Sequence, residues 1–180
     1  GKMSAATPIR IGVLGAGTVG GHVIHLLDQW ADEYERRLGV RLDVESVLVR
    51  RLEAKRAFPI ASELLSTDPY AVIDGKDIVV ELIGGVEPAF DYVMAALRNG
   101  SAVVTGNKAL IASRGPELFE AARQANTRLY FEASVAGAIP VSHALSSALR
   151  GDRVRQIAGI VNGTTNFILD AMTTRGANYN

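Results

Sequence analysis

Cysteine is absent from the 180 residues of this chain. Its absence excludes disulfide bonds, thiolate metal sites and cysteine nucleophiles as the basis of the fold or the chemistry. Neither sign of charge predominates, because 19 lysines and arginines balance 19 aspartates and glutamates. A chain without an excess of positive charge is not expected to attract a polyanion, so we expect no nucleic-acid partner.

Long apolar runs are also missing from the sequence. No stretch approaches the roughly 20 residues that a membrane-spanning helix needs, and the first residues lack the apolar segment of a signal peptide. We therefore expect no membrane partner and a cytoplasmic location. Hydrophobic residues form 48% of the chain and glycines number 18, which is ordinary for buried parallel strands joined by tight loops.

A glycine-rich segment stands between two apolar stretches near the N-terminus. Residues 8–27 read PIRIGVLGAGTVGGHVIHLL, which predicts a buried strand, a turn through Gly15, Gly17 and Gly20, and a helix. In this G-x-G-x-x-G pattern, the first glycine permits a tight turn, the second admits a pyrophosphate, and the third lets helix and strand pack closely. The helix N-terminus then offers free N–H groups to an anion. The pattern predicts dinucleotide binding, and a glycine-rich turn without a ligand is the alternative.

Strand and helix patterns alternate along the rest of the chain. Three of the expected strands are almost wholly apolar, as strands covered on both faces are. The expected fold is therefore α/β, with a doubly wound parallel sheet. The expected strands are 42–49, 77–83, 102–105 and 128–132, the expected helices are 87–98 and 116–125, and the linker-like stretches are 51–61 and 113–116.

Two arginines follow the second of these strands, at the sheet edge where such folds bind ligands. An NAD-selective site usually has an acid here for the ribose 2′-hydroxyl, whereas arginine accommodates a 2′-phosphate. Glu45 lies inside the strand, and Arg50 and Arg51 lie at its tip. The sequence favours NADP with NAD as the alternative, unless the two arginines belong only to a solvated loop.

Lys108 is the only ionisable residue of the VVTGNKAL segment. It follows a strand that is expected to end beside the nicotinamide, where a lysine binds a substrate oxygen or, if partly desolvated, moves a proton. The alternative is an exposed lysine at the start of a helix, and its position alone does not separate the two.

Five segments occur in a fixed order: IGVLGAGTVG, DIVVELIGG, VVTGNKALIA, YFEASVAGAIPV and GIVNGTTNFIL. From about Arg10 to the last residue, the chain resembles the N-terminal half of a homoserine dehydrogenase of a bacterial type. One departure is Gly106, where the family usually has alanine. The resemblance implies a Rossmann-type NAD(P)-binding domain over residues 1–139, followed over 140–180 by the beginning of an α+β substrate and dimerisation domain.

The resemblance also implies an activity. The family is an oxidoreductase of the aspartate pathway to threonine and methionine, and it interconverts aspartate 4-semialdehyde and homoserine with NAD(P)H. Full-length members are expected to be homodimers. The fragment is expected to be inactive alone, because a second lysine and a substrate-binding aspartate of the family lie beyond its last residue. The alternative is a dinucleotide-binding module without turnover of its own.

Particular residues take roles by this resemblance. Lys108 is implied as a catalytic lysine that also borders the cofactor. A sodium or potassium ion is implied in the EASVAGAIP turn, held by the Glu132 carboxylate and the carbonyls of Val135, Gly137 and Ile139. The implied cofactor-binding residues are Gly15, Gly17, Thr18, Val19 and Gly20 at the pyrophosphate, Arg50 and Arg51 at the adenosine phosphate, and Ile83 and Gly84 at the nicotinamide. The implied substrate residues are Asn162, Gly163 and Thr164.

Overall fold

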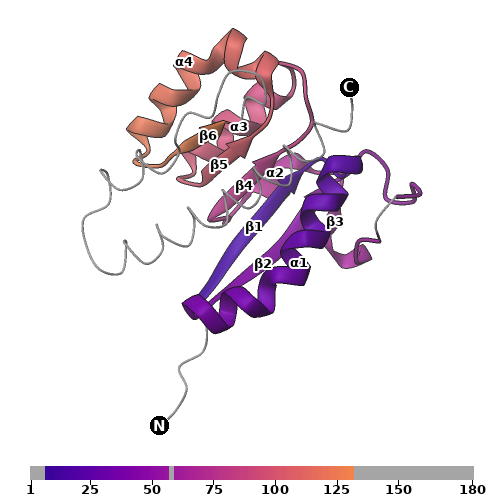
Figure 1. The fold of residues 1–180 in the computed structure, drawn as a ribbon. Coiled ribbons are helices and arrows are strands. Elements are labelled where there is room, and N and C mark those ends of the chain that lie inside the picture. Colours follow the sequence, from indigo (N-terminus) through magenta and orange to yellow (C-terminus); the bar gives the residue numbers. More distant parts are fainter. Residues whose placement is uncertain (1–6, 57–58, 132–180) are drawn as a thin grey trace.

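A computed structural model of the chain describes residues 7–56 and 59–131 (Figure 1). Its strands form one parallel sheet of six, in the order β3-β2-β1-β4-β5-β6. The predicted α/β class, with a doubly wound parallel sheet, is confirmed. The elements are β1 (Thr7–Leu14), α1 (Thr18–Leu38), β2 (Val40–Leu48), the 3-10 helix η1 (Ser62–Leu64), β3 (Leu65–Ser66), α2 (Pro69–Ile73), β4 (Ile78–Glu81), α3 (Ala89–Arg98), β5 (Ala102–Thr105), α4 (Lys108–Gln124) and β6 (Leu129–Phe131).

Helices lie on both faces of the sheet (Figure 1). Ile78 and Val80 of β4 pack in the cluster that contains the buried side chains of α1, whereas Val79 packs in the cluster of α2, α3 and α4. All four residues of β4 are buried, because successive side chains of a strand point to opposite faces and both faces are covered. By the same alternation, Glu81 points to the face of Val79.

The switch in strand order falls at β1. This strand pairs with β2 along its whole length and with β4 along residues 11–14. In such sheets the crevice for a ligand opens outside the carboxyl ends of the strands, at the point where the order reverses. The fold thus brings the loops after β1, β2, β4 and β5 to one edge.

The predicted helix over 116–125 and the predicted linker over 113–116 were wrong at their boundary, because α4 begins at Lys108. The side-chain oxygen of Asn107 accepts a hydrogen bond from the N–H of Leu110 at 3.1 Å and caps the helix there. Pro116 lies inside α4. It removes one helix hydrogen bond, to the carbonyl of exposed Ala112, which water can satisfy.

The stretch from η1 to α2 was not predicted. β3 has two residues, too few for a periodic signal. The short helix α2 begins with Pro69 after Asp68, whose carboxylate accepts from the N–H groups of Tyr70 at 3.0 Å and Ala71 at 3.3 Å. The other expected strands and the helix over 87–98 are present, with ends shifted by about one to two residues. Within the described ranges, no helix has both the length and the apolarity to cross a membrane.

Candidate functional site

The turn between β1 and α1 has the backbone that the glycine pattern predicts. Gly15 has a φ of 104°, in the left-handed region that favours glycine. A Cβ on Gly20 would collide with the carbonyl oxygen of Gly15. Helix and strand therefore approach closely enough that only glycine fits at residue 20.

The N-terminus of α1 is open to a ligand. Gly17 is the N-cap and has no side-chain capping bond, and the first turn holds no acidic residue. A Cβ on Gly17 would meet nothing within 4 Å. The first N–H groups of an α-helix have no partner inside the helix, so those at Thr18, Val19 and Gly20 are available to a phosphate. These residues fit the pyrophosphate of a dinucleotide.

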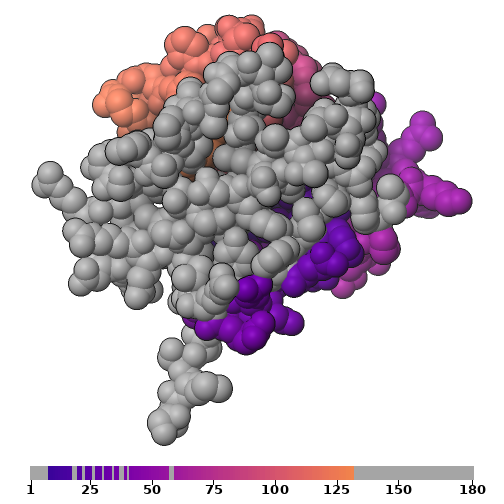
Figure 2. Space-filling model, viewed as in Figure 1, coloured from indigo at the N-terminus to yellow at the C-terminus, as the bar shows by residue number. Residues whose placement is uncertain are grey.

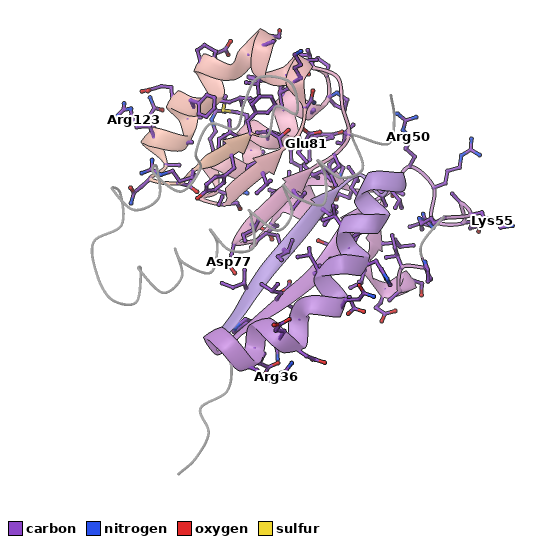
Figure 3. The ribbon with its side chains drawn as sticks, viewed as in Figure 1. Arg36, Arg50, Lys55, Asp77, Glu81 and Arg123 are labelled. Atoms are coloured by element: carbon purple, nitrogen blue, oxygen red, sulfur yellow. The ribbon has the colours of Figure 1, made fainter. Side chains whose placement is uncertain are left out.

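The loop after β2 carries exposed cations. Arg50 and Arg51 are both exposed, and Figure 3 shows Arg50 and Lys55 pointing away from the fold. Figure 2 shows the same loop projecting from the body of the molecule. Within residues 7–56 and 59–131, neither Arg50 nor Arg51 forms an ion pair. Both guanidinium groups are therefore free to bind an anion.

Arg56 shapes this loop from within. Its guanidinium donates hydrogen bonds to the carbonyl of Arg51 at 2.5 Å and to that of Ala54 at 2.9 Å. Glu45, the nearest acid in β2, is occupied elsewhere, because it lies 3.5 Å from the Arg10 guanidinium and 3.6 Å from the Lys76 ammonium. No carboxylate from β2 therefore stands at the strand tip to compete for Arg50.

A buried carboxylate lies at the carboxyl end of β4. Glu81 is 0% exposed, and Figure 3 shows it at the opposite end of β4 from Asp77. One of its oxygens, Oε1, accepts from the N–H of Ile83 at 2.8 Å and from that of Gly84 at 3.2 Å. The other, Oε2, accepts from the hydroxyl of Thr105 at 2.5 Å. The loop after β4 is therefore held from inside the sheet.

Asn107 connects this loop to α4. Its amide nitrogen Nδ2 donates to the carbonyl of Gly85 at 2.5 Å, and its backbone N–H donates to the hydroxyl of Thr105 at 3.0 Å. Lys108 follows as the first residue of α4 and is exposed. An ammonium at this point reaches solvent and any ligand that lies along the edge of the sheet.

The predicted residues of the turn and of the β4 loop lie together. A Cβ on Gly15 would be 3.3 Å from the carbonyl of Leu82 and 3.4 Å from the backbone nitrogen of Ile83. The hydrogen bond from Leu82 N–H to the Leu14 carbonyl, at 2.9 Å, joins the same segments. The glycine turn and the loop after β4 are thus neighbours, with Arg50 on the other side of β1.

Three residues of the site were not predicted, namely Glu81, Thr105 and Asn107. The sequence did contain a signal for the first, because a charged residue interrupts the apolar run DIVVELI. A carboxylate in a strand covered on both faces must have hydrogen-bond partners. Those partners come from the next strand and from loops, and so are not visible in the run itself.

The implied cation and substrate residues lie outside the described part of the chain. Among residues 7–56 and 59–131, no group of three or more histidine, aspartate or glutamate side chains is placed to hold a metal ion. The residues outside are Glu132, Val135, Gly137 and Ile139 of the cation loop, and Asn162, Gly163 and Thr164 of the substrate region.

The strand order, the open glycine turn and the uncapped helix define a dinucleotide-binding domain of the doubly wound class. Residues 15–132 match the family model for the NAD-binding domain of homoserine dehydrogenase, and residues 140–180 match a second model, for homoserine dehydrogenase. The chain belongs to the homoserine dehydrogenase family.

Known relatives agree in sequence and in structure. The homoserine dehydrogenase of Corynebacterium glutamicum is 49% identical over 173 residues, which are 95% of this chain and 39% of that protein. That of Bacillus subtilis is 44% identical over 95% of this chain and 40% of its own length. The crystal structure of the Thiobacillus denitrificans enzyme has a TM-score of 0.65 at 46% identity and covers 79% of this chain and 33% of that chain. This chain therefore spans only about two-fifths of the curated relatives' length.

Proposed function

We propose that this chain is the cofactor-binding part of an NADP-dependent homoserine dehydrogenase, which interconverts aspartate 4-semialdehyde and homoserine. The observation that carries the proposal is the arrangement of three features along one edge of the sheet. These are the uncapped N-terminus of α1, the exposed Arg50 after β2, and the exposed Lys108 after β5. The first fits a pyrophosphate, the second a 2′-phosphate, and the third a reacting oxygen.

NADP is favoured over NAD by charge. A guanidinium pairs with a phosphate through two hydrogen bonds, and Glu45 of β2 is engaged with Arg10 and Lys76. An acid that would bind a ribose 2′-hydroxyl is therefore not available from this strand. A hyperthermophilic archaeal homoserine dehydrogenase of the same fold has been solved in complex with NADPH.

In this proposal Lys108 is the general acid. The cofactor, when bound, would supply the hydride for the aldehyde carbon. The Lys108 ammonium stabilises the negative charge that develops on the aldehyde oxygen and donates a proton to it, directly or through water. In the reverse direction, the neutral amine accepts the proton of the homoserine hydroxyl. The exposed position of Lys108 lets a substrate approach it.

The rest of the assignment rests on the family resemblance. We propose a nucleotide domain over residues 1–139, the beginning of a substrate and dimerisation domain over 140–180, and a homodimer in the cytoplasm for the longer protein. We further propose that Asn162, Gly163 and Thr164 contact the substrate. The proposed ligands of a sodium or potassium ion are Glu132, Val135, Gly137 and Ile139.

Calorimetric titration of the 180-residue chain tests the cofactor half of the proposal. We expect NADPH to bind at least about tenfold more tightly than NADH, the ratio that one charge-assisted hydrogen bond provides. Equal affinities would contradict NADP selectivity, and no binding of either would contradict the proposal as a whole. The alternative, a module without turnover, is tested by assaying homoserine oxidation by a protein that also contains the residues following Asn180 in its relatives.

The proposed ion is tested by thermal melting. The chain is melted in potassium, in sodium and in a bulky organic cation at matched ionic strength. A bound ion stabilises the folded state by mass action, so we expect a higher Tm in at least one of the two small cations. Identical Tm values in all three salts would contradict the ion site.

A further inference from the structure

We propose that Glu81 is a positioning residue, which fixes the nicotinamide-side loop 82–85 relative to Lys108. The inference rests on the proposed function, because it assigns the loop after β4 to the nicotinamide half of the cofactor. In a sheet of this order the dinucleotide crosses at the switch point. With Arg50 at the adenosine end, the nicotinamide lies over the loops after β4 and β5.

The burial of Glu81 needs an explanation. Its side chain is fully buried, and within the described ranges it forms no ion pair. A carboxylate without a cation is costly inside a protein unless hydrogen bonds satisfy its oxygens, and an aliphatic side chain would serve a core position better. The presence of glutamate at position 81 is therefore explained by the groups that donate hydrogen bonds to its oxygens.

Those oxygens act only as acceptors. The N–H of Asn107 donates to Thr105 Oγ1, so the hydroxyl hydrogen of Thr105 is free to point at Glu81 Oε2. The second oxygen receives the N–H groups of Ile83 and Gly84. Donors converge on both oxygens, and a carboxylate is the group that accepts at both.

The arrangement follows from strand register. Glu81 and Thr105 are register partners in the parallel pair β4 and β5, and their side chains point to the same face. Each is the last residue of its strand, so a bond between them joins the starts of the two loops. Two different binding loops are thereby anchored at one point.

A second bond closes the connection into a ring. The side-chain amide of Asn107 donates to the carbonyl of Gly85, and its oxygen caps α4 at Leu110. Loop 82–85 is thus tied at Glu81 and again at Asn107, the residue before Lys108. Gly84 and Gly85 have φ values of 83° and 73°, and glycine has little conformational preference of its own. The hydrogen bonds of this ring therefore fix the conformation of a loop whose glycines would otherwise allow several conformations.

The substitution Glu81→Gln separates positioning from folding. Glutamine keeps the shape and one oxygen for Ile83 and Gly84, but its NH2 group cannot accept the hydroxyl hydrogen of Thr105. The charge-assisted bond between the two strand ends is thereby lost, and at most a weaker, reversed bond from the NH2 group to the hydroxyl oxygen replaces it. We expect NADPH to bind at least tenfold more weakly. Adenosine 2′,5′-bisphosphate, which has no nicotinamide, should bind within twofold of the unsubstituted chain. This second ligand reports whether the adenosine side is still folded.

Thr105 provides a second pair of variants. Thr105→Val removes the hydroxyl that bridges Glu81 and Asn107, and it should weaken NADPH by at least tenfold with no change for the bisphosphate. Thr105→Ser keeps the hydroxyl and should restore NADPH binding to within about threefold of the original. Rescue by serine would not be expected if residue 105 only filled space.

Each possible result of these titrations supports or overturns the positioning role of Glu81. Unchanged NADPH affinity in both Glu81→Gln and Thr105→Val overturns the proposal. Equal weakening of NADPH and the bisphosphate also overturns it, because the effect is then on folding in general. If the unsubstituted chain binds the bisphosphate but not NADPH, the positioning role fails while an adenosine site remains. If it binds neither ligand, the proposed function fails first.

Discussion

The carbonyl oxygen of Gly15 occupies the place that a side chain on Gly20 would take. The contact joins the end of β1 to the first turn of α1, and it brings the helix N-terminus to the sheet. Gly17, between them, has open space on the corresponding side. Gly20 is therefore required for packing, whereas Gly17 leaves space for a ligand.

Alanine at each position separates these requirements. Gly20→Ala should lower the free energy of unfolding by ~1–3 kcal/mol, the usual cost of overpacking. Gly17→Ala should cost no more than about 1 kcal/mol, because its φ of −62° suits alanine and only the poorer capping by alanine counts against it. It should weaken NADPH by about tenfold or more, because the methyl group stands where a pyrophosphate approaches. Urea denaturation and calorimetry measure the two effects. A stable Gly20→Ala chain, or full NADPH affinity in Gly17→Ala, would contradict this account.

Arg50 should determine the preference for the 2′-phosphate. Arg50→Ala should weaken NADPH by ~1–2 kcal/mol, about the strength of a charge-assisted hydrogen bond, and leave NADH nearly unchanged. Arg36 offers a matched control, because it is exposed at the far end of α1 (Figure 3). Arg36→Ala should alter neither affinity. Equal losses of affinity for NADPH and NADH in Arg50→Ala would show that this arginine attracts anions in general and does not select the 2′-phosphate.

Lys108 should matter for turnover more than for cofactor binding. In a protein extended to the length of its relatives, Lys108→Ala should reduce turnover by ~10²-fold or more, because proton transfer to the aldehyde oxygen is lost. The NADPH affinity should change little. Stopped-flow assays of semialdehyde reduction and a separate NADPH titration measure the two quantities. Near-normal turnover would remove Lys108 from the mechanism.

Tyr130 offers a test by stability and pH. Its hydroxyl is buried without a hydrogen-bond partner among the described residues, and burial raises the pKa of Tyr130 above its ordinary value. Tyr130→Phe should therefore leave the unfolding free energy equal or raise it by up to about 1 kcal/mol. The exposed Tyr70 provides the control variant, Tyr70→Phe, which should have no effect.

The pH dependence of that variant follows from the raised pKa. An unfolded chain ionises its tyrosines near pH 10, whereas the folded state keeps Tyr130 protonated. The folded state consequently binds more protons above that pH, and stability falls as the pH rises. Urea denaturation between about pH 9 and pH 11 should show a smaller loss for Tyr130→Phe than for Tyr70→Phe. Parallel losses would show that Tyr130 ionises normally in the folded chain.

Local pattern was sufficient for some elements and not for others. The glycine turn, β5 and the start of α1 depend on residues that adjoin in sequence, and the sequence predicted them. The start of α4 was missed because Pro116 and Gly115 resemble a helix boundary, whereas the cap that decides it is Asn107. One local signal, the N-cap at Asn107, outweighed another there, because proline is tolerated inside this helix at an exposed position.

The site shows the same division. Gly15 and Arg50 are candidates from the sequence alone because each lies within two residues of the end of a strand, and Gly20 is one because it completes the glycine pattern. The role of Glu81 depends on β5 being its neighbour in the correct register, which brings a residue 24 positions away into contact. The periodicity of a single strand or helix does not reveal which residue of another strand will lie beside it. The apolar run only indicated that Glu81 would need partners.

β1 is the only strand that touches both halves of the described sheet, with β2 and β3 on one side and β4, β5 and β6 on the other. Arg50, which we propose to select the cofactor phosphate, and Lys108, which we propose to transfer the proton, therefore follow strands on opposite sides of β1. Substitutions after β2 can accumulate without altering the loops that follow β4 and β5. We therefore expect that substitutions in the loop after β2 alone can change the preference between the two dinucleotides and leave the loops after β4 and β5 as they are.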